Sequence, residues 1–461
     1  MKTAAFETVA AISTPPGKGG VAVIRMSGAS ALEIAERCFS ARSGRSVFAL
    51  PDRTAVYGDI LADGETVDDG ILTLFRAPHS YTGEDTVELS CHGGLLVQMR
   101  VLEGLLRAGA RPAPRGEFTR RAYLSGNISL SDAEAIGALI DAENDEQLRL
   151  SSRRARSRFS EQTTAIADRV LAVMSELDAL LDYPEEEPSE TTAEGFAARL
   201  LEVADEIDRL AGSYQTGRAI TSGIRGVLAG KPNVGKSSIY NRLLGEDAAI
   251  VTQIAGTTRD VLERRILIGR VTVELADTAG VHQTDDPVET IGVRRSREKI
   301  DAAELILAVL DRSTPLDEDD LELLDYVRRA NGTPILLLNK SDLTAAWGRE
   351  QLPFEPEHVI ECSTLTGQGF DELSTLVNKL FTDPSLAIGE SAIVTTARQL
   401  AALRDAEEAL RTAANELSGG YPLDAAAATV ERALRSLFEV DGRAAGEEIV
   451  DAIFRNFCVG K

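Results

Sequence analysis

Short apolar runs separated by turns make up the first part of the chain, from Met1 to about Gly116. They cover Thr8–Ser13, Gly20–Met26, Thr54–Ile60, Gly70–Phe75 and Thr86–Ser90, and a helical stretch follows at Leu95–Ala108. Alternation with a period of two residues is typical of strands, and a 3.6-residue repeat is typical of helices. The pattern predicts an N-terminal α+β domain.

The apolar period becomes helical from about Leu130 to Leu210. Two stripes step by four and three residues: Ile166, Val170, Val173, Leu177 and Leu180, then Phe196, Leu200, Val203, Ile207 and Leu210. Each stripe forms one apolar face, as helices in a bundle require. The proline-flanked, acidic segment 183–188 between them predicts a break.

Strands alternate with helices from about Ile220 to Phe381, and helical character returns at Ala397. Such alternation indicates a mainly parallel α/β sheet. We therefore expect an α/β domain inserted into a discontinuous helical domain. The expected boundaries are 1–118 for the N-terminal domain, 119–217 and 383–461 for the two helical parts, and 218–382 for the insertion.

Composition narrows the functional classes. The chain has 461 residues, 43% of them hydrophobic, and a net charge of −24. No apolar run approaches the ~20 residues of a membrane span, and we see no export signal. The four cysteines lie far apart, without metal or disulfide spacing. These features favour a soluble cytoplasmic protein without a membrane partner.

The acidic net charge opposes nucleic-acid binding, so such a role needs a local basic patch. The one dense basic run contains Arg149, Arg153, Arg154, Arg156 and Arg158, between helical segments. Two interpretations stay open: a solvated helix face, or a contact with an RNA backbone.

A phosphate-binding loop is the strongest chemical signal. Gly230–Ser237 has the pattern of Gly, four residues and Gly-Lys-Ser, between a predicted strand (Arg225–Ala229) and a helix (Ser238–Leu244). Backbone amides can curl around phosphates, Lys236 can neutralise phosphate charge, and the hydroxyl of Ser237 can hold Mg²⁺.

Further motifs follow in the order expected of GTPases. Asp277–Gly280 ends one strand, where an acidic residue can reach the magnesium shell. Asn339–Asp342 ends another, and Asp342 can accept two hydrogen bonds from guanine that adenine cannot offer. Ser363–Leu365 fits a base-contacting loop. Together they predict GTP as the nucleotide.

One usual part is missing from this site. Ras-type GTPases place a glutamine after the switch glycine to orient the attacking water, but Val281 follows Gly280 here. Glu289 and a bound monovalent cation are candidates for the missing polar roles. The alternative is a slow GTPase in which Glu289 is only a surface residue.

The string from Gly245 to Arg259, together with the phosphate loop and the final Cys458–Lys461, resembles the MnmE (TrmE) family of tRNA modification GTPases. The resemblance spans the chain through Thr14–Gly17 with Gly19 and Gly20, Thr82–Asp85, His92–Gly94 and Arg115–Phe118.

The resemblance implies a GTP site, residue by residue. It comprises Asn233, Val234, Gly235, Lys236, Ser237, Ser238, Thr252, Gln253, Ile254, Ala255, Gly256, Thr257, Thr258, Asp277, Thr278, Ala279, Gly280, Asn339, Lys340, Ser341, Asp342, Ser363, Thr364 and Leu365. The implied Mg²⁺ ligands are Ser237 and Thr258, and the implied K⁺ residues are Asn233, Thr252, Ile254 and Thr257. Glu289 matches the catalytic glutamate, and K⁺ takes the place of an arginine finger while two G domains meet.

The resemblance also implies a constitutive homodimer through an N-terminal domain that binds a tetrahydrofolate derivative (5-formyl- or 5,10-methylene-). Its contacts match Arg25 and Glu88, and Asn127 stands where the family has a lysine. On the residues alone, Arg25 and Glu88 could be a ligand-free pair on a β-face. The tail, with Lys461, reaches the folate pocket in the family, and Cys458 is needed for modification but not for GTP hydrolysis. On its own, Cys458 would be an exposed thiol on a flexible tail.

The implied function is modification of the wobble uridine of certain tRNAs at C5. It proceeds with an FAD-dependent partner, MnmG (GidA), in a heterotetramer, and adds a carboxymethylaminomethyl-type group. An alternative is a ribosome-assembly switch like the related Era and Der GTPases. A third possibility, suggested by Asn127, is a GTPase with a degenerate folate site.

Overall fold

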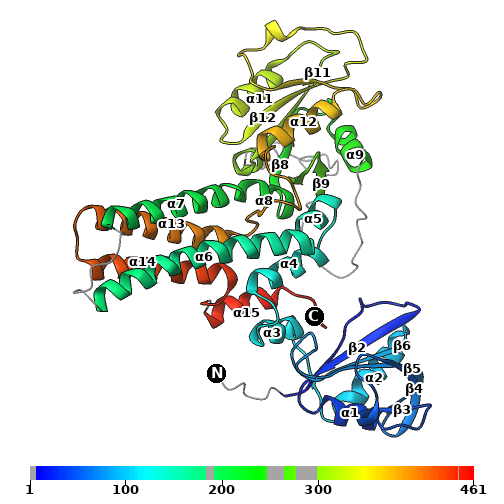
Figure 1. The fold of residues 1–461 in the computed structure, drawn as a ribbon. Coiled ribbons are helices and arrows are strands. Elements are labelled where there is room, and N and C mark those ends of the chain that lie inside the picture. The colour runs from blue at the N-terminus through cyan, green and yellow to red at the C-terminus, as the bar shows by residue number, and fades with distance from the viewer. Residues whose placement is uncertain (1–6, 183–191, 247–263, 277–297, 445, 461) are drawn as a thin grey trace. The chain divides into compact units, whose positions relative to one another are not determined.

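The computed structural model describes residues 7–182, 192–246, 264–276, 298–444 and 446–460 (Figure 1). The chain divides into two compact units, Met1–Gly137 with Phe438–Lys461, and Ala138–Leu437. The first unit thus joins the two ends of the sequence. No helix within the described ranges is both long and apolar enough to cross a membrane.

The first unit contains a seven-stranded sheet in the order β3-β4-β5-β6-β2-β1-β7, antiparallel except for the β1–β7 pair. Its strands are β1 (Val9–Ile12), β2 (Val21–Ser27), β3 (Phe39–Ala41), β4 (Ala55–Ala62), β5 (Glu65–Phe75), β6 (Thr86–His92) and β7 (Arg111–Pro112). The predicted N-terminal strands are confirmed within two residues at each end, except that β5 begins five residues earlier.

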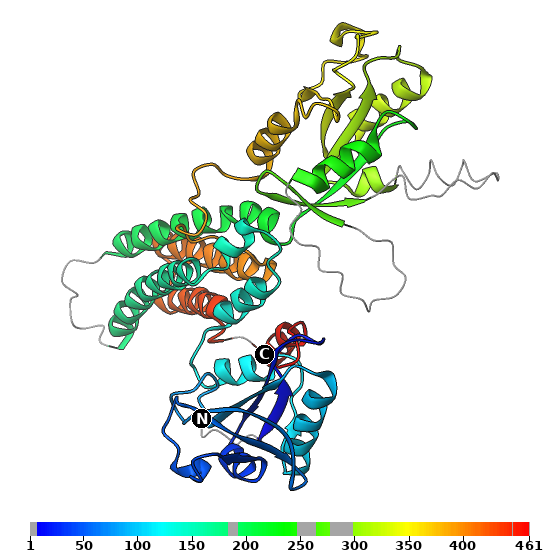
Figure 2. The same cartoon turned by 90° about the vertical axis from the view of Figure 1, so that its right-hand side faces the viewer.

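Helices α1 (Ala31–Cys38) and α2 (Leu95–Arg107) pack against this sheet (Figure 2). A 3-10 turn (Val47–Ala49), which lies between β3 and β4 in the chain, contacts α1. Alternate residues of β2, such as Ile24 and Met26, are buried in the shared core. The sequence pattern did not predict α1, because the helix is short and strand β3 follows it without a gap. The N-terminal α+β architecture is confirmed.

Three more helices complete the first unit. They are α3 (Glu117–Leu124), α4 (Leu130–Ile140), whose last three residues are assigned to the second unit, and the C-terminal α15 (Glu447–Arg455). Leu130, Phe454 and Phe457 form a small core in which the two aromatic rings lie 5.4 Å apart. This apolar contact places the end of the chain beside its first domain.

The second unit begins with a helical bundle. Its helices are α5 (Asp145–Leu150), α6 (Arg153–Asp182), α7 (Ala193–Gly212), α8 (Tyr214–Thr221), α13 (Ala397–Ser418) and α14 (Leu423–Asp441). The predicted stripes lie inward, with Leu177 and Ile207 fully buried, whereas Leu180 is only half-buried. Segment 183–188, the predicted break, lies outside the described residues.

The basic run was misplaced by the sequence pattern. Arg149 lies in α5 and the other four arginines lie inside α6, not between helices. The helices are separated only by Ser151 and Ser152, and arginine is a good helix former. The run is therefore helical.

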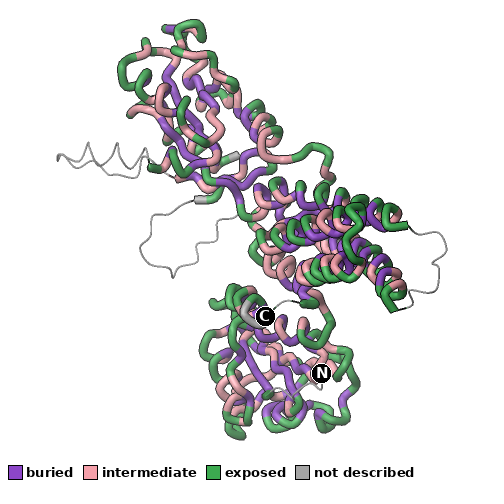
Figure 3. The backbone as a smooth tube through the Cα atoms, turned by 90° about the vertical axis from the view of Figure 1, so that its left-hand side faces the viewer, coloured by how far each residue is buried: buried purple, intermediate pink, exposed green. Residues whose placement is uncertain are grey.

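A six-stranded sheet interrupts the bundle, in the order β13-β12-β11-β8-β10-β9, with only β9–β10 antiparallel. Its elements are β8 (Ile224–Ala229), α9 (Lys236–Glu246), β9 (Arg264–Ile268), β10 (Val271–Ala276), β11 (Leu305–Asp311), α11 (Glu318–Arg329), β12 (Thr333–Asn339), a 3-10 turn (Arg349–Gln351), β13 (Val359–Glu361) and α12 (Phe370–Phe381). Every residue of β11 is buried, as in a sheet covered on both faces. Figure 3 colours the backbone by burial and shows buried, purple segments in the interior of each unit. The inserted, mainly parallel α/β fold is confirmed.

Candidate functional site

The phosphate loop joins the end of β8 to the start of α9. Its backbone turns at three positive φ angles, 152° at Gly230, 65° at Asn233 and 102° at Gly235. The ammonium group of Lys236 donates to the carbonyls of Gly230 (2.6 Å) and Lys231 (2.8 Å). The loop thus curls around the ammonium group of Lys236. A curled loop of this kind can bind phosphate oxygens through its backbone N–H groups and the lysine charge.

Residues at the end of β12 support this loop. The buried Asn339 donates from Nδ2 to the carbonyl of Val234 (2.8 Å). A Cβ at Gly235 would lie 2.2 Å from that same nitrogen, so the contact requires glycine. Side chains predicted from two separate motifs are therefore brought together.

The base-contacting side is also assembled. Ser363 Oγ donates to Asp342 Oδ1 (2.5 Å), which fixes the carboxylate expected to meet guanine. Lys340 Nζ pairs with Asp311 Oδ2 (2.5 Å). Burial opposes ionisation of Asp311, but hydrogen bonds from Lys340 and Ser313 lower the pKa of its carboxyl below the usual range.

A basic residue that sequence analysis did not single out anchors the loop from its other side. Lys231 Nζ lies 2.6 Å from Asp317 Oδ2 and 2.7 Å from Asp320 Oδ2, at the start of α11. Burial acts against its charge, but these hydrogen bonds raise the pKa of the Lys231 ammonium. Asp320 is buried, so the pair ties the phosphate loop to the core.

Part of the predicted site lies outside the described residues. This part comprises Thr252, Gln253, Ile254, Ala255, Gly256, Thr257, Thr258, Asp277, Thr278, Ala279, Gly280, Glu289 and Lys461. Of the predicted cation ligands, Asn233 lies in the phosphate loop and Ser237 in the first turn of α9. Their roles remain predictions.

A second candidate site lies on the N-terminal sheet. Arg25 and Glu88 are register partners on β2 and β6, and Arg25 Nη2 lies 2.7 Å from Glu88 Oε1. The guanidinium carbon lies 5.8 Å from the ring centre of Tyr81 and 5.6 Å from that of Phe118. This pair lines a cavity of about 370 Å³ with Phe75, Tyr81, Thr86 and Ile136.

Asn127 lies next to one wall of this cavity. Its Nδ2 donates to the carbonyls of Ser80 and Tyr81, each at 3.1 Å. The amide therefore holds the segment that carries Tyr81. Sequence analysis did not find Tyr81 itself, although it directly precedes the Thr82–Asp85 motif.

The chain end is held on the same unit. Val459 forms a bridge with Arg115, and Ser13 Oγ donates to the carbonyl of Gly460 (2.9 Å). Gly460 is buried with a φ of 91°, whereas Cys458 is exposed. The exposed thiol is confirmed, but the expectation of a flexible tail is wrong for the backbone of 458–460. Sequence reasoning missed Ser13, which directly precedes the Thr14–Gly17 motif.

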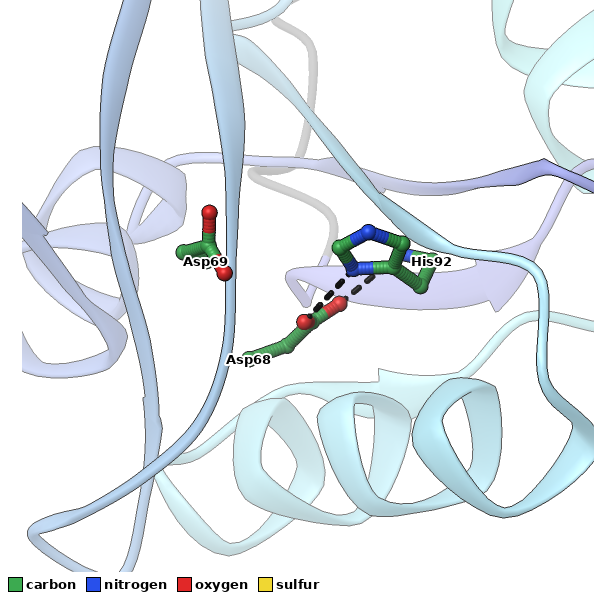
Figure 4. A group of neighbouring side chains, drawn as sticks. All are labelled: Asp68, Asp69 and His92. Atoms are coloured by element: carbon green, nitrogen blue, oxygen red, sulfur yellow. Dashed lines mark hydrogen bonds and ion pairs between the residues drawn. The ribbon is translucent and has the colours of Figure 1, made fainter.

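Figure 4 shows a third cluster, in which Asp68 faces the ring of His92 while Asp69 stands apart. Asp68 accepts the backbone N–H and the Nδ1–H of His92, both at 2.8 Å. Asp69 accepts the hydroxyl of Tyr57. The hydrogen bond that the His92 imidazole donates to Asp68 raises the pKa of that imidazole. Since the carboxylates are occupied by protein donors, the cluster fixes the start of the His92–Gly94 turn.

Comparison with known proteins agrees with these features. The MnmE helical domain matches residues 130–458, and the N-terminus of the GTP-binding protein TrmE matches 8–127. The tRNA modification GTPase MnmE of Symbiobacterium thermophilum is 42% identical over 460 residues, 99% of each chain. The MnmE of Carboxydothermus hydrogenoformans is 38% identical over the same coverage. The chain belongs to the MnmE family of tRNA modification GTPases.

Membership in the MnmE family fits the assembled loop motifs, and the protein is a GTPase that binds GTP. Among solved structures, the G domain of the T. maritima FeoB iron transporter is 27% identical over 34% of this chain and 97% of that chain, with a TM-score of 0.26. The MnmE relatives cover the whole chain.

Proposed function

We propose that this protein modifies the C5 position of the wobble uridine of certain tRNAs, using GTP hydrolysis, a tetrahydrofolate derivative and an FAD-dependent MnmG partner. One observation carries the proposal: this MnmE-family chain has both an assembled GTPase loop and a separate cavity lined by Arg25 and Glu88. The tail with Cys458 is held on the same unit as that cavity. As a homodimer acting on tRNA, it would work in the cytoplasm.

The cavity lined by Arg25 and Glu88 suits a flat, polar ring such as a pterin. Pterins carry adjacent N–H donors and a carbonyl acceptor along one edge, which match a carboxylate and a guanidinium. Glu88 can accept from such donors, Arg25 can donate to the carbonyl, and Tyr81 offers an aromatic wall. A bound folate would supply a one-carbon unit, while these residues bind and orient it.

The Cys458 thiol is the nucleophile that the tail offers near this unit. The other three cysteines are buried, and burial raises the pKa of the Cys38 and Cys91 thiols to about 11 and that of Cys362 to about 12. A thiol needs its thiolate form to react, so the buried cysteines are inert at neutral pH. Cys458 is therefore the cysteine suited to chemistry.

On the GTPase side, Asn233 and Ser237 would contribute to the K⁺ and Mg²⁺ sites. Asn233 offers an amide oxygen from a left-handed turn, and Ser237 offers a hydroxyl in the first turn of α9. Such oxygen donors suit both cations. K⁺ would supply positive charge at the phosphates, and Glu289 would orient the water.

The folate site is tested by titration calorimetry of the full chain with 5-formyltetrahydrofolate. We expect binding that Arg25→Ala weakens at least tenfold, because the cavity loses its one guanidinium and leaves Glu88 uncompensated. Arg42→Ala is the matched control, since Arg42 pairs with Asp59 elsewhere on the same sheet. Equal affinity in wild type and Arg25→Ala would refute the site.

A further inference from the structure

The loop that follows β13 is closed almost entirely on itself. The N–H groups of Leu365 and Thr366 donate to Ser363 Oγ (3.2 Å each), and that of Gly367 donates to the Ser363 carbonyl (2.9 Å). The N–H groups of Ser363 and Gln368 also have partners within the loop. Among the described residues, Thr364 is the one position from 363 to 368 whose backbone N–H has no protein acceptor.

That N–H is a suitable donor for a base. Guanine carries a carbonyl oxygen, O6, beside the N1–H and amino group that a carboxylate can accept. Asp342 is tied to this loop through Ser363, so a base held by Asp342 lies beside the loop. An unsatisfied amide there can read O6, where adenine would present an amino group instead.

Arg242 holds the same residue from α9. Its Nη1 donates to the carbonyl of Thr364 (3.0 Å), and its guanidinium carbon lies 5.3 Å from the ring centre of Phe370. The guanidinium also lies flush against Gly367, where an added Cβ would be 2.2 Å from Nη2. Two contacts on the loop, at Thr364 and Gly367, and one with the first residue of α12 therefore converge on one side chain.

The arrangement links both ends of the nucleotide site. Helix α9 begins at Lys236 in the phosphate loop and carries Arg242 six residues later. A rigid helix rises about 1.5 Å per residue, so it fixes the spacing between its first turn and Arg242. The guanidinium of Arg242 is planar, stacked and hydrogen-bonded, so it holds the Thr364 loop at a fixed distance from α9 better than a flexible side chain would.

We propose that Arg242 is a positioning residue for guanine selectivity, which holds Thr364 so that its N–H meets O6 of the base. Arg242 itself does not touch the nucleotide. The role concerns the GTPase activity alone and does not depend on folate or tRNA chemistry.

The test compares GDP with 6-thio-GDP, which replaces only O6 by sulfur, a weak acceptor. Dissociation constants are measured on the full chain by competition against a fluorescent guanine nucleotide. In wild type we expect 6-thio-GDP to bind more weakly than GDP. In Arg242→Met this ratio should fall about tenfold towards one, mainly because GDP binds less tightly.

Two further variants complete the design. Gly367→Ala, which displaces the guanidinium, should lower the ratio in the same direction. Arg265→Met is the matched control, since Arg265 pairs with Glu274 on the neighbouring strands, and it should leave the ratio unchanged. If Arg242→Met lowers the melting temperature or weakens both nucleotides equally while the ratio stays at its wild-type value, Arg242 is merely structural and the proposal is overturned.

Discussion

Replacing Gly460 by alanine should release the chain end from the N-terminal unit without unfolding it. An added Cβ would lie 2.2 Å from the carbonyl oxygen of Ile12 and 2.8 Å from Cα of Ser13. Both neighbours are backbone atoms that belong to, or directly follow, strand β1, so they cannot move aside easily. The substitution also forces alanine to a φ of 91°, which side chains disfavour.

The magnitude follows from the cost of backbone strain. A left-handed backbone costs a non-glycine residue about 1–2 kcal/mol. The hydrogen bond from Ser13 Oγ to the Gly460 carbonyl favours the held tail equally in wild type and variant, so it does not add to the change. The strain of about 1–2 kcal/mol corresponds to a roughly 5- to 30-fold shift towards the released tail.

The assay uses a maleimide fluorophore on Cys458, the exposed thiol, and reads its steady-state anisotropy. Wild type should give high anisotropy because the tail is held at Arg115 and Ser13, and Gly460→Ala should give low anisotropy with unchanged melting temperature. Val459→Ala is the control, since the Val459 side chain is exposed. High anisotropy in Gly460→Ala would refute the reasoning.

Three further predictions concern other parts of the chain. Lys231→Met should lower the free energy of unfolding of the G domain by about 1–3 kcal/mol, because Asp320 stays buried without its cation. Urea unfolding followed by the fluorescence of Trp347, the single tryptophan, measures this loss. Adding Asp320→Asn to the Lys231→Met variant should restore part of the stability. Asp68→Asn should return the His92 pKa to about 6.5 by NMR titration. In wild type the stabilisation from this pair is fully present below that value and disappears as the pH rises through the raised pKa; a His92 that titrates identically in both proteins would contradict the assignment. Glu289→Ala should keep GTP affinity but lose most turnover in a phosphate-release assay, and unchanged turnover would exclude its catalytic role.

The sequence predicted the elements with strong periodicity and the loops with strong motifs. The two strands that carry Arg25 and Glu88 were expected from their alternation, and their register now places the two side chains opposite each other. The phosphate loop followed from spacing alone, because glycine and lysine at fixed positions have few other uses.

Contacts between distant segments could not be predicted in this way. Ser13 lies 447 residues from Gly460, and Arg242 lies 122 residues from Thr364. Neither pair has a local pattern, since a single serine or arginine is compatible with many surroundings. The helical basic run was misplaced for a related reason: Ser151 and Ser152 resemble the start of a loop, although only two residues separate the helices.

The most direct test of the proposed function is mass spectrometry of nucleosides from bulk tRNA of cells depleted of this protein. We predict that C5-aminomethyl-type wobble uridines disappear and that wild type restores them, whereas Cys458→Ser does not. Normal levels of these uridines in the depleted cells would contradict the account.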